Sequence, residues 1–192
     1  MSGPGVAILG TGMSDMSRRD LSPETMAYQV TYEALDDAGV SPHELGLVLV
    51  GNAMAGRLCD QGCVRGQTWL RKAGISDAAI INVDNSCAGG SSSLHLATMA
   101  ATVQDRPVLA IGVEKMWTGD RAGTIAGIED GLPAEYREDL HERRHADDNP
   151  AGSILMGLNN GWAHRLMAEV GATVRQIAAA AVKASATSSK HR

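Results

Sequence analysis

The sequence has 192 residues, and 44% of them are hydrophobic, which is enough for an ordinary domain with a packed core. The formal net charge is −5 and no run of Lys or Arg stands out, so the composition argues against a nucleic-acid partner. The start lacks the basic and apolar segments of an export signal, no stretch suits a membrane span, and three cysteines fit reduced thiols, so we expect a cytoplasmic protein with no membrane partner.

Short apolar runs alternate with helical patterns along the first part of the chain. The clearest boundary is a helix start at Ser22, because serine is a favoured N-cap and the proline and acid after it suit a first turn. Gly39 supplies the stop of that helix. The predicted elements, in chain order, are strand Val6–Gly10, the helix from Ser22 to Gly39, strand Leu45–Val50, a helix within 60–74, strand Ala79–Val83, helix Ser91–Gln104 and strand Val108–Val113. This order predicts an α/β fold with a mostly parallel sheet, helices on both faces, and ligand sites beyond the carboxyl ends of the strands.

The helix predicted at Ser91–Gln104 consists almost entirely of small and apolar residues. A helix without a charged face is usually buried on several sides. We therefore expect a buried helix in a layered fold.

From Trp117 to about Pro150 charged residues accumulate and no strand pattern continues, so we predict a loop excursion over the surface. Helices are predicted again at Ile154–Val170 and from Val174 to about Ala186. The chain thus divides into an α/β core at 1–116, a charged loop at 117–152 and a helical segment at 153–192.

Cys87 lies in the turn between the third strand and the helix that follows it. The free N–H groups and the positive dipole end of that helix favour a thiolate, which is the nucleophilic form of cysteine. Gly89 and Gly90 would keep the approach to the sulfur open. A small buried cysteine without a chemical role gives the same local pattern, so the pattern alone leaves both interpretations open.

Two patterns suggest metal ligands, and both favour a simpler interpretation. Cys59 and Cys63 are spaced C-x3-C, but no second pair follows them, so cysteines in a loop or helix near the mouth of the site are favoured over a zinc site. His141 and His145 are four residues apart among many charges, which favours a solvated helix face. We predict no metal site.

Two further patterns carry no cofactor chemistry. His95 follows Cys87 by about two helical turns, too far to activate the sulfur directly, and we predict a hydrogen-bonded core residue. The pair Gly10 and Gly12 lacks the third glycine of a dinucleotide fingerprint, so no nicotinamide cofactor is implied.

From Val6 to about Lys183 the sequence resembles the thiolase superfamily, in particular its sterol-carrier-protein-x and lipid-transfer-protein branch. The segments that carry the resemblance are Val6–Gly12, Glu33–Val40, Asn82–Ser91 and Ile111–Met116. In that family a cysteine at the position of Cys87 takes up an acyl group from a thioester. The resemblance implies an acyl-CoA C-acyltransferase that cleaves or condenses 3-ketoacyl thioesters through an acyl-enzyme at Cys87, with a coenzyme A or acyl-carrier thioester as substrate and no other cofactor.

The segment Ser153–Gly157 resembles the stretch with which this branch re-enters its helical part. The resemblance assigns Met156 there, together with Gly89 and Gly90, to the substrate site, and core packing is the alternative for Met156. It also implies a dimer formed through the region Ser91–Gln104.

The sequence departs from the family in one respect. Family members carry a second, similar half that supplies the general-base histidine and the other acid/base group in motifs such as His-Asp-Cys-Phe or Cys-x-Gly-x-Gly, and neither motif occurs here. We therefore expect only the first half of the duplicated fold, as a truncation or as one subunit of a split enzyme. A second subunit with the other half, or an OB-fold/zinc-ribbon partner, would complete it. The alternative is a lipid-transfer-type acyl-CoA-binding scaffold, or an aldolase subunit, with little activity of its own.

Overall fold

The computed structural model describes residues 5–146 and 154–189, except for the side chains of 144–146. The chain forms two compact units, residues 1–127 and 128–192. The first unit contains α1 (Pro23–Ala38), β1 (Leu47–Gly51), α2 (Ala55–Leu58), α3 (Arg65–Leu70), β2 (Ala79–Val83), α4 (Gly89–Ala101) and β3 (Val108–Gly112), with 3-10 turns at Pro42–Glu44 and Ser86–Ala88. α5 (Arg121–Glu129) crosses the boundary, and the second unit continues with α6 (Ala134–Ala146), α7 (Ile154–Val170) and α8 (Val174–Ser188).

The sheet of the first unit is parallel, in the order β2-β1-β3. Gly51 at the end of β1 stands beside Val83 of β2 and Gly112 of β3. The three carboxyl ends are therefore level at one edge, as is usual where a parallel sheet forms a ligand site. The predicted α/β fold with a parallel sheet is confirmed.

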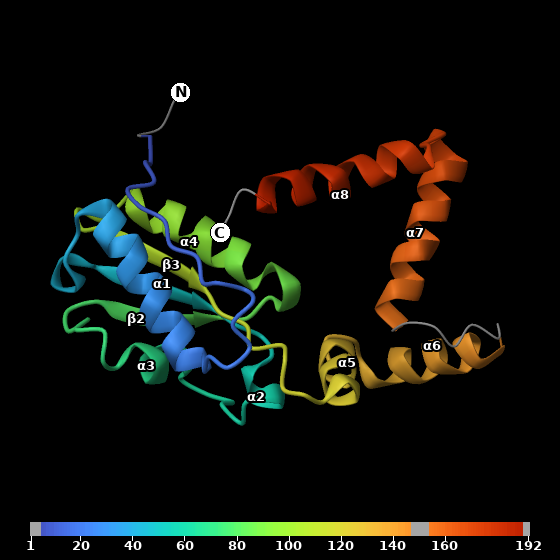
Figure 1. Cartoon of the computed structure of the whole chain (residues 1–192), viewed down its shortest axis with the longest axis horizontal. Helices are drawn as coiled ribbons and strands as arrows, with labels where there is room; N and C mark the ends of the chain where they lie inside the picture. The colour runs from blue at the N-terminus through green and yellow to red at the C-terminus, as the bar shows by residue number, and fades with distance from the viewer. Residues whose placement is uncertain (1–4, 147–153, 190–192) are drawn as a thin grey trace. The chain divides into compact units, whose positions relative to one another are not determined.

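Helices cover both faces of this sheet (Figure 1). Every residue of β1 is buried, and its side chains alternate between the faces. Val48 and Val50 pack in the cluster that contains residues of α1 and α3, whereas Leu47 and Leu49 pack with Ala97 of α4. Burial of each such side chain stabilises the fold by about 1.5–3 kcal/mol, so β1 is the centre of the core.

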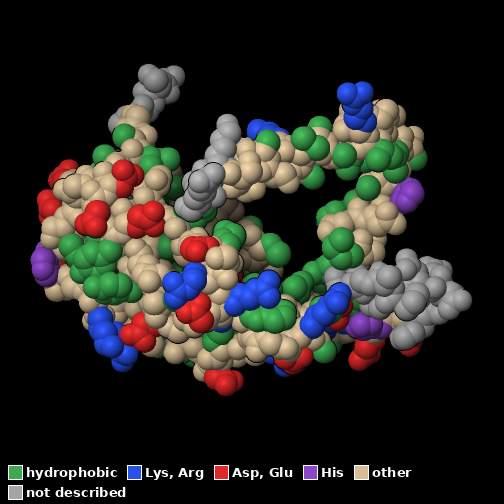
Figure 2. Space-filling view, in the orientation of Figure 1, with side chains coloured by type: hydrophobic (Ala, Val, Ile, Leu, Met, Phe, Trp, Pro, Cys, Tyr) green, Lys and Arg blue, Asp and Glu red, His purple; other side chains and the backbone are tan. Residues whose placement is uncertain are grey.

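α1 begins and ends as the sequence predicts. Ser22 is the N-cap and accepts a hydrogen bond from the Thr25 N–H at 3.1 Å. Gly39 is the C-cap in the left-handed region, with φ of 64°. Acidic side chains gather over the face that α1 presents in Figure 2, and α1 itself carries no Lys or Arg.

The strand predicted at Val6–Gly10 is wrong, because this segment has no regular structure and is largely exposed. It lies along α1, where the Thr11 N–H donates to Asp37 Oδ2 at 2.9 Å. A methyl group on Gly10 would collide with the carbonyl oxygen of Ala34. A short apolar run forms a strand only where a strand edge accepts its hydrogen bonds, and in this chain α1 is its partner instead.

Two helix predictions need adjustment. The helix expected within 60–74 is the six-residue α3, preceded by the short α2. α4 starts two residues earlier than predicted and buries one stripe, formed by Gly89, Ser93 and Ala97. The remaining sides of α4 are exposed or half-buried in this chain.

The predicted loop excursion contains helices α5 and α6. Alternating acidic and basic residues form helices readily, and the pair Arg143 with Asp139 at 2.9 Å has the helical i,i+4 spacing. Buried Glu129 at the end of α5 accepts the first N–H of α7, from Ile154, at 3.2 Å and pairs with His141 at 3.3 Å. The His145 side chain lies outside the described residues, and the division into 1–116, 117–152 and 153–192 stays a prediction.

α7 has the predicted bounds, and α8 extends to Ser188. Across the ranges 5–146 and 154–189, no helix combines the length and apolar character that crossing a membrane requires.

Candidate active site around Cys87

Cys87 lies in the 3-10 turn Ser86–Ala88, between β2 and the first turn of α4, and it is exposed. The turn is held by its own backbone, since the Ala88 N–H donates to the Asn85 carbonyl at 2.9 Å. Ser86 has a φ of 45°, in the left-handed region that serine seldom adopts. Such strain persists only where the surrounding structure enforces it, which is common at functional sites.

Gly51 lets the start of α4 rest directly on the end of β1. A methyl group there would lie 2.7 Å from the carbonyl carbon and oxygen of Gly89 and 2.9 Å from Ser93 Oγ. Gly89 is buried at this contact, whereas Gly90 is exposed with open space where its side chain would be. The first turn of α4 is thereby fixed at the sheet edge next to Cys87, where the positive end of the helix dipole can stabilise negative charge.

Asn52, the first residue after β1, ties the ends of all three strands together. It is 3% exposed, and its backbone N–H donates to the Val83 carbonyl of β2 at 3.1 Å. Its Nδ2 donates to the Val113 carbonyl at 2.6 Å and to Glu114 Oε2 at 2.9 Å, directly after β3. Its Oδ1 accepts the Ala55 N–H at 3.1 Å, which fixes the orientation of the amide.

Glu114 also holds the loop that follows Asn52. Its Oε1 accepts the Ala53 N–H at 2.6 Å, and its Oε2 accepts the Met54 N–H at 3.3 Å. Although the residue reaches the surface, its carboxyl group is turned against this loop, and the resulting desolvation raises the pKa of Glu114 above its ordinary value. The two backbone N–H groups and the Arg65 charge act in the opposite direction.

Arg65 closes the neighbouring loop over the same edge. Its guanidinium donates to the carbonyl of Asn52 at 2.7 Å, of Gln61 at 3.1 Å and of Gly62 at 3.4 Å. It also lies 3.8 Å from Asp84 Oδ2, just before the Cys87 turn. Loop 59–64 is thus fixed to the strand ends through a single side chain.

Cys59 and Cys63 lie in this loop, and a position near the mouth of the site stays a prediction. Cys63 is exposed, and partial burial raises the pKa of the Cys59 thiol. Within the described part of the chain, no three His, Cys, Asp or Glu side chains are placed to share a metal ion.

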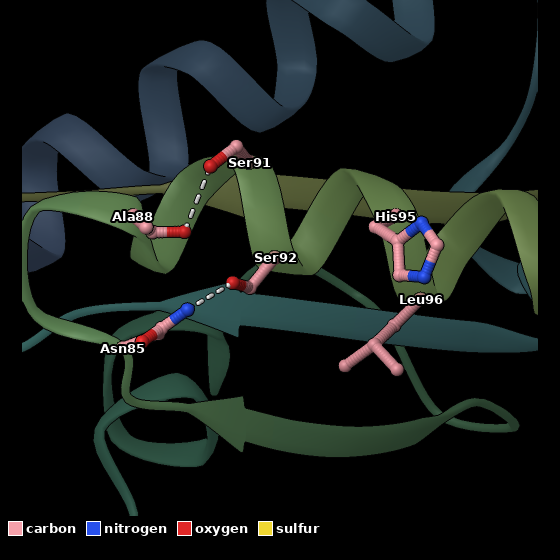
Figure 3. A pocket seen from close by; sticks show the side chains of 6 residues that line it. All are labelled: Asn85, Ala88, Ser91, Ser92, His95 and Leu96. Carbon is pink, nitrogen blue, oxygen red and sulfur yellow. Dashed lines mark hydrogen bonds between the residues drawn. The ribbon is translucent and has the colours of Figure 1, made fainter.

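A shallow depression of about 500 Å³ lies along the exposed side of α4 (Figure 3). Its lining residues are Asn85, Ala88, Ser91, Ser92, His95 and Leu96. Asn85 Nδ2 donates to Ser92 Oγ at 2.8 Å across it, and Asn85 and Ala88 flank Cys87. The prediction of His95 as a core residue is wrong, because α4 turns it to the surface beside this depression.

Among the described residues, the hydrogen bond of Cys87 is with Ser86, whose Oγ lies 4.0 Å from the sulfur, and no histidine is hydrogen-bonded to it. Met156, which was predicted as a substrate-site residue together with Gly89 and Gly90, is exposed on α7 in the second unit. The roles of these residues in substrate binding stay predictions.

Residues 6–191 match the family described as "Thiolase, N-terminal domain". The chain belongs to the thiolase family. This thiolase-family chain is 30% identical over 132 residues, 66% of its length, to "Non-specific lipid-transfer protein-like 2" of Caenorhabditis elegans, and covers 31% of that protein. It is 28% identical over 180 residues, 93% of its length, to "Benzoylsuccinyl-CoA thiolase subunit BbsB" of Thauera aromatica, and covers 42% of it. The chain thus spans less than half the length of these curated relatives.

Two solved structures are similar to part of the thiolase-family chain. The 3-oxoacyl-[acyl-carrier-protein] synthase III of Aquifex aeolicus VF5 matches 50% of this chain and 31% of its own, with a TM-score of 0.44 and 21% identity. The priming β-ketosynthase of the R1128 polyketide pathway matches 57% of this chain and 33% of its own, with a TM-score of 0.43 and 20% identity.

Gly51, Asn52, Arg65 and Glu114 were not predicted as site residues from the sequence. A signal was present for three of them, since Gly51 and Asn52 directly follow the second predicted strand and Glu114 follows the fourth. Carboxyl ends of parallel strands meet at one edge, so polar residues there are candidates to lie beside Cys87. Arg65 carried no such signal, because it reaches the edge from α3.

Proposed function

We propose that this chain is the nucleophile-bearing part of a thiolase-type acyltransferase. The Cys87 thiolate attacks the carbonyl carbon of an acyl thioester, a new C–S bond forms, and the bond to the coenzyme A or carrier sulfur breaks as that thiolate leaves. A base on a second polypeptide removes the α-proton of a second acyl thioester, and the resulting carbanion attacks the carbonyl carbon of the acyl-enzyme. A C–C bond forms and the C–S bond to Cys87 breaks, which returns the Cys87 thiolate. Thiolytic cleavage of a 3-ketoacyl thioester is the same sequence in reverse. No cofactor beyond the thioester is required.

One observation carries this proposal: Cys87 is exposed on a strained turn at the level carboxyl edge of a parallel sheet, beside the first turn of α4. An exposed cysteine held at a helix start suits nucleophilic attack, whereas a structural cysteine is generally buried. Gly90 has open space where its side chain would be, which supports the binding of a thioester on that side of the turn.

A second polypeptide, carrying the other half of the fold, is part of the proposal. The general base and acid of the reaction would come from that partner, because no histidine is hydrogen-bonded to Cys87 among the described residues. General acid–base catalysis contributes about 10²–10⁴-fold, so the chain alone should transfer acyl groups slowly. A dimer of this chain through Ser91–Gln104 is also part of the proposal. It is supported by three exposed apolar side chains of α4, those of Leu94, Leu96 and Met99.

The proposal is tested by intact-protein mass spectrometry after incubation with acetyl-CoA and longer acyl-CoAs, with and without any co-purifying polypeptide. An acyl adduct that is lost in Cys87→Ala and kept in Cys63→Ala is expected. Cys63→Ala is the matched control, because Cys63 is also an exposed free thiol. An adduct on Cys63 instead, or no adduct in either condition, would exclude Cys87 as the acyl carrier.

A second function is favoured by the 30% identity to a protein named as lipid-transfer-like. In that case the chain binds an acyl-CoA without forming a covalent bond, or serves as an aldolase subunit whose chemistry lies on a partner. Equilibrium binding of an acyl-CoA that is unchanged in Cys87→Ala, without any adduct, would support this function over acyl transfer.

A further inference from the structure

Asn52 contacts the residues at both ends of the Cys87 turn, and Glu114 accepts a hydrogen bond from Asn52. Among the described residues, no hydrogen bond joins either side chain to the Cys87 sulfur. We propose that this Asn52–Glu114 pair is a positioning unit, which fixes the Cys87 turn against the start of α4. The inference rests on the proposed function, in which Cys87 is the nucleophile.

The connection from this pair to Cys87 runs through backbone. The Asn52 N–H donates to the Val83 carbonyl at 3.1 Å, and Val83 is the last residue of β2 before the turn. On the other side of the turn, a methyl group added to Gly89 would lie 3.7 Å from the backbone nitrogen of Asn52, so Gly89 packs against Asn52. Both ends of the segment that carries Cys87 therefore rest on Asn52, and a shift of Asn52 displaces Cys87 relative to the first turn of α4.

Glu114 determines where Asn52 sits. Its carboxylate is an acceptor for Asn52 Nδ2 and for the N–H groups of Ala53 and Met54. Asn52 cannot reorient its amide to suit a different partner, because its Oδ1 accepts the Ala55 N–H and its Nδ2 also donates to the Val113 carbonyl. Only a group with acceptors on both sides satisfies all three donors at once.

Glu114→Gln is therefore the sharpest perturbation. A glutamine has nearly the same shape but one acceptor, so its NH₂ group must face a donor, either Ala53 N–H or the pair from Asn52 and Met54. The matched control is Glu33→Gln, since Glu33 also accepts a loop N–H, from Met13 at 3.0 Å, but does so on α1.

The readout is the rate of iodoacetamide alkylation at each cysteine, resolved by peptide mass spectrometry across pH. For Glu114→Gln we expect Cys87 to react about two- to fivefold more slowly, the effect of weakening one helix-terminus interaction, and its pH profile to move to higher pH. Cys63 should be unchanged, and Glu33→Gln should leave both cysteines unchanged. Loss of the negative charge of Glu114 would by itself favour the Cys87 thiolate and speed alkylation. Local unfolding of the turn would also speed alkylation. A slower reaction therefore distinguishes a loss of positioning from these two effects.

Three outcomes overturn the inference: an unchanged or faster Cys87, equal slowing of Cys63, or amide hydrogen exchange that is unchanged at both Ala53 and Met54. If Glu114→Gln loses the native circular-dichroism spectrum, Glu114→Asp replaces it. Aspartate keeps the charge but withdraws both acceptors, so it should slow Cys87, and an unaltered rate would overturn the inference. Alkylation needs no acyl substrate, so a failure of acyl transfer and a failure of positioning are distinguished.

Discussion

Gly51→Ala should destabilise the first unit and displace the start of α4. The added methyl group would lie 2.7 Å from the Gly89 carbonyl and 2.9 Å from Ser93 Oγ, closer than such atoms approach in folded proteins. The Gly89 neighbour is backbone in the first turn of a helix, so relief requires α4 to move away from β1. Overpacking of this kind costs about 1–3 kcal/mol. For a chain of this size the melting temperature should fall by about 2–12 °C.

Gly90→Ala is the matched control, one helix position beyond Gly89. Nothing lies within 4 Å of the position its methyl group would take, and its backbone is helical. Alanine in place of a helical glycine stabilises by about 0.4–1 kcal/mol, so the same chemical change should have the opposite sign at the two sites.

The assay is thermal unfolding followed by tryptophan fluorescence. Trp69 is 4% exposed in the core of the first unit, whereas Trp117 and Trp162 are exposed, so a red shift of the emission reports on that unit. Equal melting temperatures for Gly51→Ala and Gly90→Ala would refute the argument that α4 is fixed to β1 by close backbone contact.

Three further predictions concern the same unit. Ser22→Ala removes the acceptor of the Thr25 N–H at the start of α1 and should lower the free energy of unfolding by about 1 kcal/mol. A urea midpoint equal to that of the parent chain would refute the capping role. Cys59 should be alkylated more slowly than Cys63 at pH 8, because burial raises the pKa of the Cys59 thiol; equal rates in a peptide-resolved experiment would contradict this. Desolvation raises the pKa of Glu114 above 4.5, so the folded chain keeps this proton to higher pH than the unfolded chain does. The resulting contribution to the free energy of unfolding is complete below about pH 4.5 and is lost as pH rises through the folded-state pKa. The urea midpoint of the chain relative to that of Glu114→Gln should therefore fall as pH rises from 4 to 7, and a constant difference would show that this carboxyl group is not desolvated.

The sequence alone determined the features whose causes are local. The cap at Ser22, the stop at Gly39 and the bounds of β2 and α7 follow from residues within a few positions, because capping and periodicity act over one or two turns. The position of Cys87 at a strand-to-helix turn followed in the same way. Parallel pairing was predictable too, since strands that alternate with helices can return only in parallel.

Tertiary structure decided whatever depends on which surfaces meet. The run at Val6–Gly10 has the composition of a strand, yet its backbone lies along α1, since pairing depends on a partner that local sequence does not specify. The role of Gly51 appears only where β1 meets α4. Asn52 and Glu114 are 62 positions apart, and they act together because β1 and β3 are neighbours in the sheet. The place of Cys87 at a strand-to-helix turn could thus be predicted from its own neighbours in sequence, whereas the side chains that meet beneath the strand ends are assembled by the folded sheet.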